Sequence, residues 1–415
     1  MADVHVLDVL LHGEPVGTLA RLDGDRTLFG FRDAYVQDAA RPVLGLSFKD
    51  RFGEPITSFR PTRTQLLPYF SNLLPEGRLR TYLAERAGVH PEREFFLLWV
   101  LGRDLPGAVT IRPATGDDWP SEVDDAPGRP APGEGGRRRQ AFRFSLAGVQ
   151  LKFSAVQTAR GGLTIPAEGI GGSWIVKLPS SEFEGVPENE YSMMTLAGLM
   201  GMNVPAVRLI DVRDVADLPE GIGRFGGTAL AVARFDRTPD GPVHVEDFAQ
   251  VFGVHPESKY RQASACNVAA VVGAEGTSAD VAEFIRRLTF STLIGNADLH
   301  LKNWALMYPD RRRAVLAPAY DFVSTIAYIP DDRAALKYSR TKFFSEFSED
   351  ELSHLAARAL LPERVVLDAA RETVALFRQH WRAEKLNLPL AANAVAAIES
   401  HLTTVPLAGA GSYGS

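Results

Sequence analysis

Hydrophobic and polar residues alternate along the first 112 residues in short runs that are typical of β-strands. The runs VHVLDVLL, VGTLARL, RTLFGF and PVLGLSF are separated by turn residues such as HGE and DGD. Alternation with a period of two gives each strand one buried face, so we expect a small, mostly antiparallel β module at 1–112. Two helical segments belong to the same stretch, LLPEGRLRTYLAERAG and EREFFLLWVLG.

The alternating pattern stops at residue 113. Residues 113–140 are dominated by Pro, Gly and charged residues and contain almost nothing that could pack into a core. This composition is typical of linkers and exposed loops. We therefore expect a Pro/Gly-rich connection at 113–140 that separates two domains.

The rest of the chain changes from strand-like to helical spacing. We expect a β-rich domain with one helix at 141–235, a helical domain at 236–405 and a loose tail at 406–415. Two amphipathic helical faces support this division. The first face consists of Met193, Leu196, Ala197 and Met200, and the second of Val366, Ala370, Val374, Phe377 and Trp381.

Composition and charge narrow the class of protein. With 415 residues, 45% of them hydrophobic and 23% charged, the chain can form two or three folded domains. The net charge of −6 argues against a broad nucleic-acid-binding surface. The single cysteine, Cys266, cannot form an intrachain disulfide, which fits a reducing cytoplasm. We expect neither a signal peptide nor a membrane span.

The candidate chemistry lies in GNADLHLKN at 295–303 and AYDF at 319–322. Asn303 follows Asp298 by five positions, and Asp321 lies 23 positions beyond Asp298. Protein kinases orient the attacking hydroxyl with an Asp and bind Mg²⁺ through an Asn five residues later and a downstream Asp. The pattern therefore suggests phosphoryl transfer, although the first phrase taken alone is more simply explained by a helix C-terminus followed by a turn.

Two upstream segments could complete a nucleotide site. SLAGVQLKFSAV at 145–156 has a small-residue tip, which would let backbone N–H groups approach phosphate oxygens; an ordinary β-turn fits it too. Lys177 lies in the apolar run SWIVKLP, and a buried lysine needs a partner or a ligand. Glu190 on the following helix could be that partner. The alternative is a solvated lysine on an edge strand.

Together these segments resemble the HipA family of bacterial serine/threonine-protein kinase toxins. FSNLLPEGRLR and LLWVLGRDLPGAVTIRP resemble the first domain of the family, and SLAGVQLKFS resembles its nucleotide loop. IVKLP, NEY, VARFDR with EDFAQ, LIGNADLHLKNWAL and LAPAYDFVST follow in the family's order and spacing. The resemblance implies an α+β, two-lobed protein-kinase-like fold of the lipid-kinase-like branch, with a β-rich N-lobe, a helical C-lobe and a small β-rich N-terminal domain.

The resemblance also implies a role for each matching residue. Asp298 matches the catalytic aspartate, and Asn303 and Asp321 match the Mg²⁺ ligands. Lys177 matches the lysine on the ATP α- and β-phosphates, with Glu190 as its ion-pair partner. The other positions that match nucleotide contacts are Ala147, Gly148, Val149, Gln150, Leu151, Lys152, Ala233, Arg234, Phe235, His300, Lys302 and Tyr320.

The resemblance has further implications for the segment Ala233 to Phe235 and for Ser145. Ala233 to Phe235 match the hinge where backbone groups hold adenine. Many relatives have Glu at the position of Ala233, so a backbone contact would survive here and a side-chain contact would not. Ser145 matches a serine that some members autophosphorylate. A phosphate there would add about −1.5 to −2 charge beside the nucleotide loop and oppose ATP binding.

The same resemblance implies ATP and Mg²⁺ as cofactors and a translation-related protein target such as an aminoacyl-tRNA synthetase. It implies a HipB-like helix-turn-helix antitoxin as partner, with DNA reached only through that antitoxin. Two alternatives remain open. One is a small-molecule or lipid kinase of the same fold, and the other is a non-catalytic ATP-binding subunit of a repressor complex.

Overall fold

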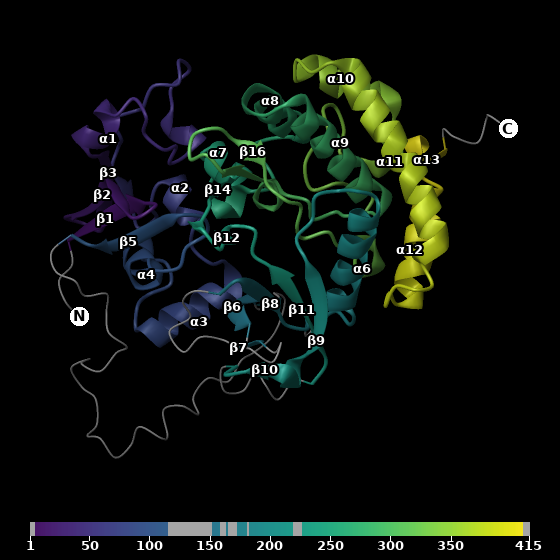
Figure 1. The fold of residues 1–415 in the computed structure, drawn as a ribbon, viewed down its shortest axis with the longest axis horizontal. Helices are drawn as coiled ribbons and strands as arrows, with labels where there is room; N and C mark the ends of the chain where they lie inside the picture. Colours follow the sequence, from purple (N-terminus) through teal and green to yellow (C-terminus); the bar gives the residue numbers. More distant parts are fainter. Residues whose placement is uncertain are drawn as a thin grey trace. The chain divides into compact units, whose positions relative to one another are not determined.

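The chain forms two compact units in the computed structural model, each assembled from segments that are distant in the sequence (Figure 1). The structure describes residues 5–114, 152–157, 163–164, 172–180, 182–218 and 226–409. Unit 1 comprises Met1–Val176, Asp211–Gly227 and Asp236–Pro256. Unit 2 comprises Lys177–Ile210, Thr228–Phe235 and Glu257–Ser415.

Unit 1 contains a five-stranded sheet with the strand order β4-β3-β2-β1-β5. Its strands are β1 (Val6–Leu11), β2 (Glu14–Leu22), β3 (Arg26–Phe31), β4 (Thr62–Arg63) and β5 (Val109–Pro113). Every neighbouring pair is antiparallel. Val9 of β1 lies opposite Gly17 of β2 and Ile111 of β5, and both Val9 and Ile111 belong to the buried apolar cluster of the unit. The structure therefore contains the antiparallel β module that the sequence predicts, but PVLGLSF at 42–48 forms no strand, and Leu46–Phe48 is a short 3₁₀ helix instead.

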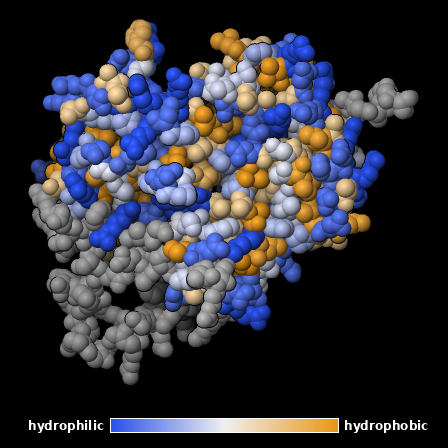
Figure 2. Space-filling model, in the orientation of Figure 1, coloured by the Kyte–Doolittle hydropathy of each residue, from blue (hydrophilic) through white to orange (hydrophobic). Residues whose placement is uncertain are grey.

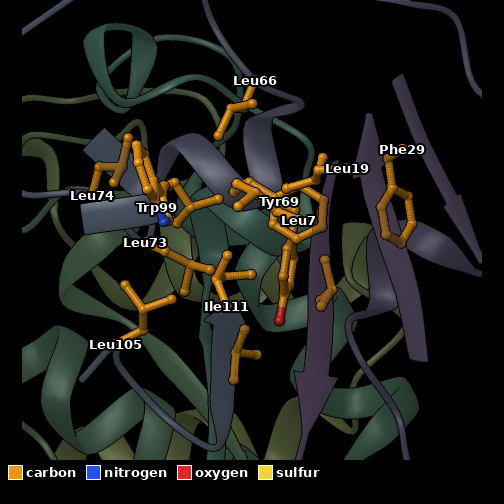
Figure 3. Packing of buried hydrophobic residues seen from close by; sticks show 14 of the residues in the cluster. Leu7, Leu19, Phe29, Leu66, Tyr69, Leu73, Leu74, Trp99, Leu105 and Ile111 are labelled. Atoms are coloured by element: carbon orange, nitrogen blue, oxygen red, sulfur yellow. The ribbon is translucent and has the colours of Figure 1, made fainter. Parts of the chain in front are cut away.

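Helices pack on this sheet and close an aromatic core. In the described part of the chain they are α1 (Asp33–Gln37), α2 (Pro68–Ser71), α3 (Gly77–Ala87) and α4 (Glu94–Leu101). Figure 3 shows side chains of the strands and helices gathered into one cluster that includes Leu7, Tyr69 and Trp99. The ring centroids of Phe29 and Phe70 are 5.0 Å apart. Such aromatic pairs bury large apolar areas and stabilise the unit.

Residues 236–256 begin with strands, whereas the sequence pattern predicts helix from about 236. The elements are β12 (Arg237–Thr238), β13 (Gly241–Pro242), β14 (His244–Asp247) and α7 (Phe248–Val251). Gly241 has φ +113°, and Pro242 lacks an N–H, so both residues disfavour a helix here. The carboxylate of Glu246 accepts the Leu46 N–H at 3.0 Å, a contact within unit 1 that no local pattern encodes.

Unit 1 also contains a second group of strands, β6 (Lys152–Gln157), β7 (Leu163–Thr164) and β10 (Val215–Ala216). They are neighbours in the order β10-β7-β6. β6 and β7 are antiparallel, whereas β10 and β7 are parallel. Strand β8 (Trp174–Lys177) ends at the first residue of unit 2.

Unit 2 joins a short β segment to a group of helices. Its elements are α6 (Val186–Leu199), β9 (Val207–Asp211), β11 (Thr228–Ala233), α8 (Ala265–Glu275), α9 (Ser278–Leu293), β15 (Ala305–Tyr308), β16 (Val315–Leu316), α10 (Glu349–Arg358), α11 (Glu363–Glu384), α12 (Ala392–Leu402) and α13 (Pro406–Gly409). Helix α9 packs against α11, with the rings of Phe290 and Phe377 6.0 Å apart (Figure 1). The predicted apolar faces of α6 and α11 are buried, which confirms both helices.

Hydrophilic and hydrophobic residues are interspersed over the face shown in Figure 2. Large exposed apolar side chains such as Leu360 and Leu386 do occur. Exposed apolar residues of this kind are normal on globular domains and imply no particular ligand. Within the described ranges, no helix combines the length and the apolar character that a membrane crossing requires.

Candidate active site

The loop that follows α9 is shaped by the way this helix ends. Gly295 has φ +65°, a left-handed conformation that glycine adopts without strain. The Gly295 N–H donates to the Thr292 carbonyl at 3.1 Å, and the Asn296 N–H donates to the Ser291 carbonyl at 2.8 Å. This is the hydrogen-bond pattern of a Schellman C-cap. A Cβ at 295 would lie 2.4 Å from Ile326 Cδ1, so the position also requires the small residue for packing.

Two side chains hold the turn that presents Asp298. Asn296 Oδ1 accepts the Asp298 N–H at 3.0 Å. Thr325 Oγ1 accepts the Ala297 N–H at 2.7 Å and donates to the Gly295 carbonyl at 3.1 Å. An Asn that bonds the backbone two residues later is a typical turn device. The helix end predicted as an alternative is therefore present, and it serves to position the aspartate.

Asp298 itself is exposed, as a residue that meets a substrate must be. The Tyr260 hydroxyl donates to Asp298 Oδ1 at 2.6 Å. The Tyr260 ring also meets the buried His300 ring edge to face, with centroids 5.0 Å apart. These contacts restrict the carboxylate on one side, while Asp298 as a whole is exposed.

Asn303 and Asp321 lie side by side, although 18 residues separate them in the sequence. Asn303 Nδ2 donates to Asp321 Oδ2 at 3.0 Å, and Asn303 Oδ1 accepts the His300 N–H at 3.3 Å. Asp321 has φ +58°, a conformation that is uncommon for residues other than glycine. Backbone conformations of this kind cluster at functional sites, so the outlier adds to the candidate site.

Lys177 is the buried centre of the polar cluster. It is 5% exposed, and its Nζ forms ion pairs with both Glu190 and Asp321. Burial alone lowers the pKa of the Lys177 ammonium, but the charges of Asp321 and then Glu190 outweigh it, and the pKa is raised above its ordinary value. The lysine therefore stays charged at neutral pH, and the predicted contact with Glu190 is present.

The donor set of this cluster fits Mg²⁺. Two carboxylates share one ammonium, so the cluster of Lys177, Glu190 and Asp321 has an excess of negative charge. Asn303 and Asp321 carry amide and carboxylate oxygens, the ligand type that Mg²⁺ prefers, and here Asn303 presents Nδ2 to Asp321 and Oδ1 to the His300 N–H. In the described ranges no group of three or more His, Cys, Asp or Glu forms a metal cage. Mg²⁺ does not need one, because it keeps several waters and phosphate oxygens as ligands.

The segment that leads into Asp321 is fixed by a buried arginine of α9. Arg287 Nη1 donates to the Ala317 carbonyl at 2.6 Å, and Arg287 Nε pairs with Glu283 at 2.8 Å. Burial lowers the pKa of the Arg287 guanidinium, an effect that the neighbouring Glu283 partly offsets. Glu283 also accepts the Asn203 N–H at 3.1 Å. A charged pair at this position restrains the backbone just before the site.

Three of the predicted nucleotide contacts lie together in unit 2, namely Phe235, Tyr320 and Lys302. The rings of Phe235 and Tyr320 have centroids 5.8 Å apart, and the Tyr320 hydroxyl donates to the Lys302 carbonyl at 2.8 Å. Ala233 ends β11, and its N–H donates to the Ala206 carbonyl at 2.8 Å. This backbone donor is therefore already used within the protein.

The remaining predicted contacts are Arg234, Lys152 and the residues of the nucleotide loop. Arg234 directly follows β11 and is half-buried. Lys152 is exposed at the start of β6 in unit 1. Ser145 and the loop residues Ala147, Gly148, Val149, Gln150 and Leu151 lie outside the described residues.

Sequence reasoning missed two residues that contact the candidate catalytic loop. Tyr260 lies 38 positions before Asp298 in no recognisable motif, so nothing in the sequence connects the two. Asn296 lies inside GNAD, and its spacing to Asp298 is the Asx-turn spacing. That signal was available, because Asn bonds its own backbone two residues later in many turns.

Comparisons with known proteins match this chain to one protein family. The profile of the HipA N-terminal domain matches residues 7–112, and that of the HipA-like C-terminal domain matches residues 144–381. The candidate kinase Y4dM of Sinorhizobium fredii is 59% identical over 98% of both chains. The serine/threonine-protein kinase toxin HipA of Shewanella oneidensis is 28% identical over 64% of this chain and 65% of its own.

A solved structure shares the fold. HipA of Shewanella oneidensis MR-1, determined in complex with HipB and operator DNA, superposes with a TM-score of 0.71 at 22% identity. The match covers 97% of this chain and 96% of that one. The predicted fold class, an α+β kinase-like fold with a β-rich N-terminal domain, is thereby confirmed.

Proposed function

This chain belongs to the HipA family, and from that premise we propose that it is an ATP- and Mg²⁺-dependent serine/threonine-protein kinase, the toxin of a toxin–antitoxin pair. One observation carries the proposal. The buried Lys177 ammonium pairs with both Glu190 and Asp321, and Asp321 also contacts Asn303. Kinases use a strand lysine, a helix glutamate and a metal-binding aspartate in this combination to hold ATP phosphates.

Each residue has a distinct task in the proposed reaction. Lys177 holds the α- and β-phosphates, and Glu190 keeps the ammonium charged and oriented. Asn303 and Asp321 hold Mg²⁺, which when bound neutralises charge on the phosphates. Asp298 orients the substrate hydroxyl and accepts its proton, because it is an exposed carboxylate on a fixed turn.

The nucleotide would be held by residues on both sides of this cluster. Phe235 and Tyr320 form an aromatic pair that offers an apolar surface to the adenine ring. Lys302 and His300 lie next to Asn303 in the sequence and supply polar groups to the phosphates. The predicted backbone contact at 233–235 is assigned to the carbonyl of Ala233 and to the later residues, because the Ala233 N–H is bonded to Ala206.

The loop at 147–152 is proposed to cover the phosphates, and Ser145 is proposed as an autophosphorylation site that opposes ATP binding. The reason is electrostatic, because a phosphoserine places about −1.5 to −2 charge beside that loop. Mass spectrometry after incubation with Mg-ATP tests this regulation. Full activity without any phosphate on Ser145 would exclude it.

The proposed binding partners of this chain are inferred from its family. The solved relative is bound to HipB and operator DNA, so we propose a HipB-like antitoxin for this chain, with DNA contacted through that antitoxin. The net charge of −6 supports the indirect contact, because DNA affinity depends on neutralising phosphates. We propose a cytoplasmic, translation-related protein as target, such as an aminoacyl-tRNA synthetase.

Phosphate transfer from labelled ATP to a protein substrate tests the function. The Asp298→Ala chain is compared with wild type and with Asp368→Ala, which removes an exposed carboxylate on α11 outside the site. We expect Asp298→Ala to lose transfer by at least about 100-fold and Asp368→Ala to retain it. Equal rates in all three proteins would favour a non-catalytic ATP-binding subunit.

Phosphoproteomics of cells that express wild type or Asp298→Ala would identify the target. Protein phosphosites that depend on Asp298 are expected. If labelled phosphate instead appears only on lipids or small molecules, the fold and the site are retained and the protein-kinase specificity is wrong.

A further inference from the structure

A small cavity lies beside the loop that carries Asp298, in the interior of unit 2. Its volume is ≈ 10 Å³, which is about the minimum that can hold a single water molecule. The walls are mostly apolar, and none of the lining residues is charged. They include Ser291 and Thr292 of α9, Asn296, Trp304 and Tyr338.

Three of the lining residues each carry a buried polar atom that lacks a hydrogen-bond partner within the described part of the chain. They are Ser291 Oγ, Asn296 Nδ2 and Trp304 Nε1. Their residues are 1%, 2% and 3% exposed, so bulk water does not reach them. Buried polar groups in folded proteins almost always have a partner. Three such atoms around one cavity therefore indicate one shared ligand.

The chemistry of the three atoms identifies that ligand. Asn296 Nδ2 and Trp304 Nε1 can only donate, whereas the Ser291 hydroxyl donates or accepts. The ligand must therefore accept at least two hydrogen bonds, which excludes ammonium and metal ions. An anion would be buried without any opposite charge on the walls, which is costly. We propose that the cavity binds one internal water molecule, which accepts from Asn296 and Trp304 and donates to Ser291.

The water site has a consequence for the loop. Asn296 Oδ1 accepts the Asp298 N–H at 3.0 Å, so one amide group has the aspartate backbone on its oxygen and the water on its nitrogen. A water that fixes the nitrogen also fixes the plane of the amide and hence the direction of its oxygen. Asn296 is thus a positioning residue for Asp298. This second step rests on the proposed function, in which Asp298 orients the substrate hydroxyl.

A high-resolution crystal structure of the full chain tests the water site without any assay of activity. Wild type is expected to show one ordered water within hydrogen-bond distance of Ser291 Oγ, Asn296 Nδ2 and Trp304 Nε1. The Trp304→Phe chain, which keeps an aromatic ring but loses one donor, is expected to show this water displaced or weakened. A dry cavity in wild type, or direct hydrogen bonds among the three side chains, would overturn the proposal.

Steady-state kinetics tests the positioning role. Asn296→Ala is expected to lower kcat by about 10-fold to 100-fold, because small misplacements of a reacting group have effects of that size. The KM for ATP is expected to stay unchanged, since Asn296 contacts the Asp298 backbone. Trp304→Phe is expected to lower kcat about fivefold, the usual effect of one lost hydrogen bond.

Trp381→Phe is the matched control. Trp381 is also buried, and its Nε1 likewise lacks a partner in the described ranges, but it lies on α11 and does not line the cavity. Its kcat should equal that of wild type, and thermal melting should show that each variant is folded at the assay temperature. Equal losses of kcat in Trp304→Phe and Trp381→Phe would overturn the positioning role. If wild type transfers no phosphate, the proposed function fails, while the crystal structure still decides the water site.

Discussion

Each of the two units buries a charged cluster, and the two clusters differ in how completely their charges are balanced. In unit 1 the Glu94 carboxylate is 1% exposed. It accepts the Leu66 N–H at 2.7 Å, accepts the Ser71 hydroxyl and pairs with Arg80 at 3.0 Å. One anion thus meets one cation and two further donors. The cluster is complete without any ligand, and its role is to join α3 and α4 to the chain before α2.

The cluster of unit 2 has a different composition. Lys177 is shared by Glu190 and Asp321, so two carboxylates meet one ammonium. Burying charge is costly, and buried ion pairs occur both at functional sites and as structural contacts. The comparison teaches that burial of charge alone does not mark a site. A functional site is indicated by an excess of one sign of charge that lies beside oxygen ligands for a cation.

Breaking each cluster at its cation gives the largest expected difference. Lys177→Met and Arg80→Met each leave a buried carboxylate without its ion-pair partner, and each should lower the free energy of unfolding by up to about 3–5 kcal/mol. Only Lys177→Met should also lower phosphate transfer, by about 10²–10³-fold, because a charged contact to the phosphates is lost. Urea unfolding and labelled-ATP assays measure the two effects.

Arg80→Met serves as the control in this pair. Its activity per folded molecule should equal that of wild type at a temperature where it is fully native. If Arg80→Met loses transfer as severely as Lys177→Met, the distinction between a structural and a functional cluster is wrong.

The pH dependence of stability tests whether buried polar groups stabilise unit 1. Burial lowers the pKa of His244 from 6.5 to about 4, and Nε2 of its neutral ring bonds the Leu44 carbonyl at 2.8 Å. Below pH 6.5 the unfolded chain binds a proton that the folded chain accepts only below about pH 4. The free energy of unfolding should therefore fall across this window, by about 3 kcal/mol in total.

Urea unfolding at several values between pH 7 and pH 4 measures this loss. His244→Gln keeps a donor for the Leu44 carbonyl and cannot titrate, so its stability should depend less on pH. A variant whose stability falls as steeply as that of wild type would show that His244 is not the responsible group.

The smallest expected effect concerns the exposed part of unit 2. Tyr260→Phe removes only the hydroxyl that donates to Asp298. Because the pair is open to solvent, kcat should fall by a modest factor of about 3 to 10, with an unchanged KM for ATP. Steady-state kinetics decides this. An increase in KM for ATP alone would mean that Tyr260 contacts the nucleotide.

Local patterns predicted much of the fold and the centre of the site. The antiparallel module follows from alternation of apolar residues, and α6 and α11 follow from their apolar faces. The pairing of Lys177 with Glu190 was expected from a lysine in an apolar strand followed by a helix glutamate, and Asn303 and Asp321 were expected near each other as ligands of one Mg²⁺. These features depend on short segments whose order in the sequence is informative.

Features that depend on tertiary contacts could not be predicted. The strands after residue 236 are held by long-range contacts within unit 1, such as that of Glu246 with Leu46. The periodicity of apolar residues along the sequence contains no information about such contacts. Tyr260 meets Asp298 across 38 residues. The positive φ of Asp321 and its bond to Lys177 arise only when the chain is folded.

The most direct test of the account is phosphate transfer by Asp321→Asn, measured together with its thermal stability. The substitution keeps the size of the side chain and removes the carboxylate that puts negative charge in excess over Lys177. The account predicts that transfer from Mg-ATP falls by at least about 100-fold while the melting temperature stays within a few degrees of wild type. Transfer at the wild-type rate would contradict it.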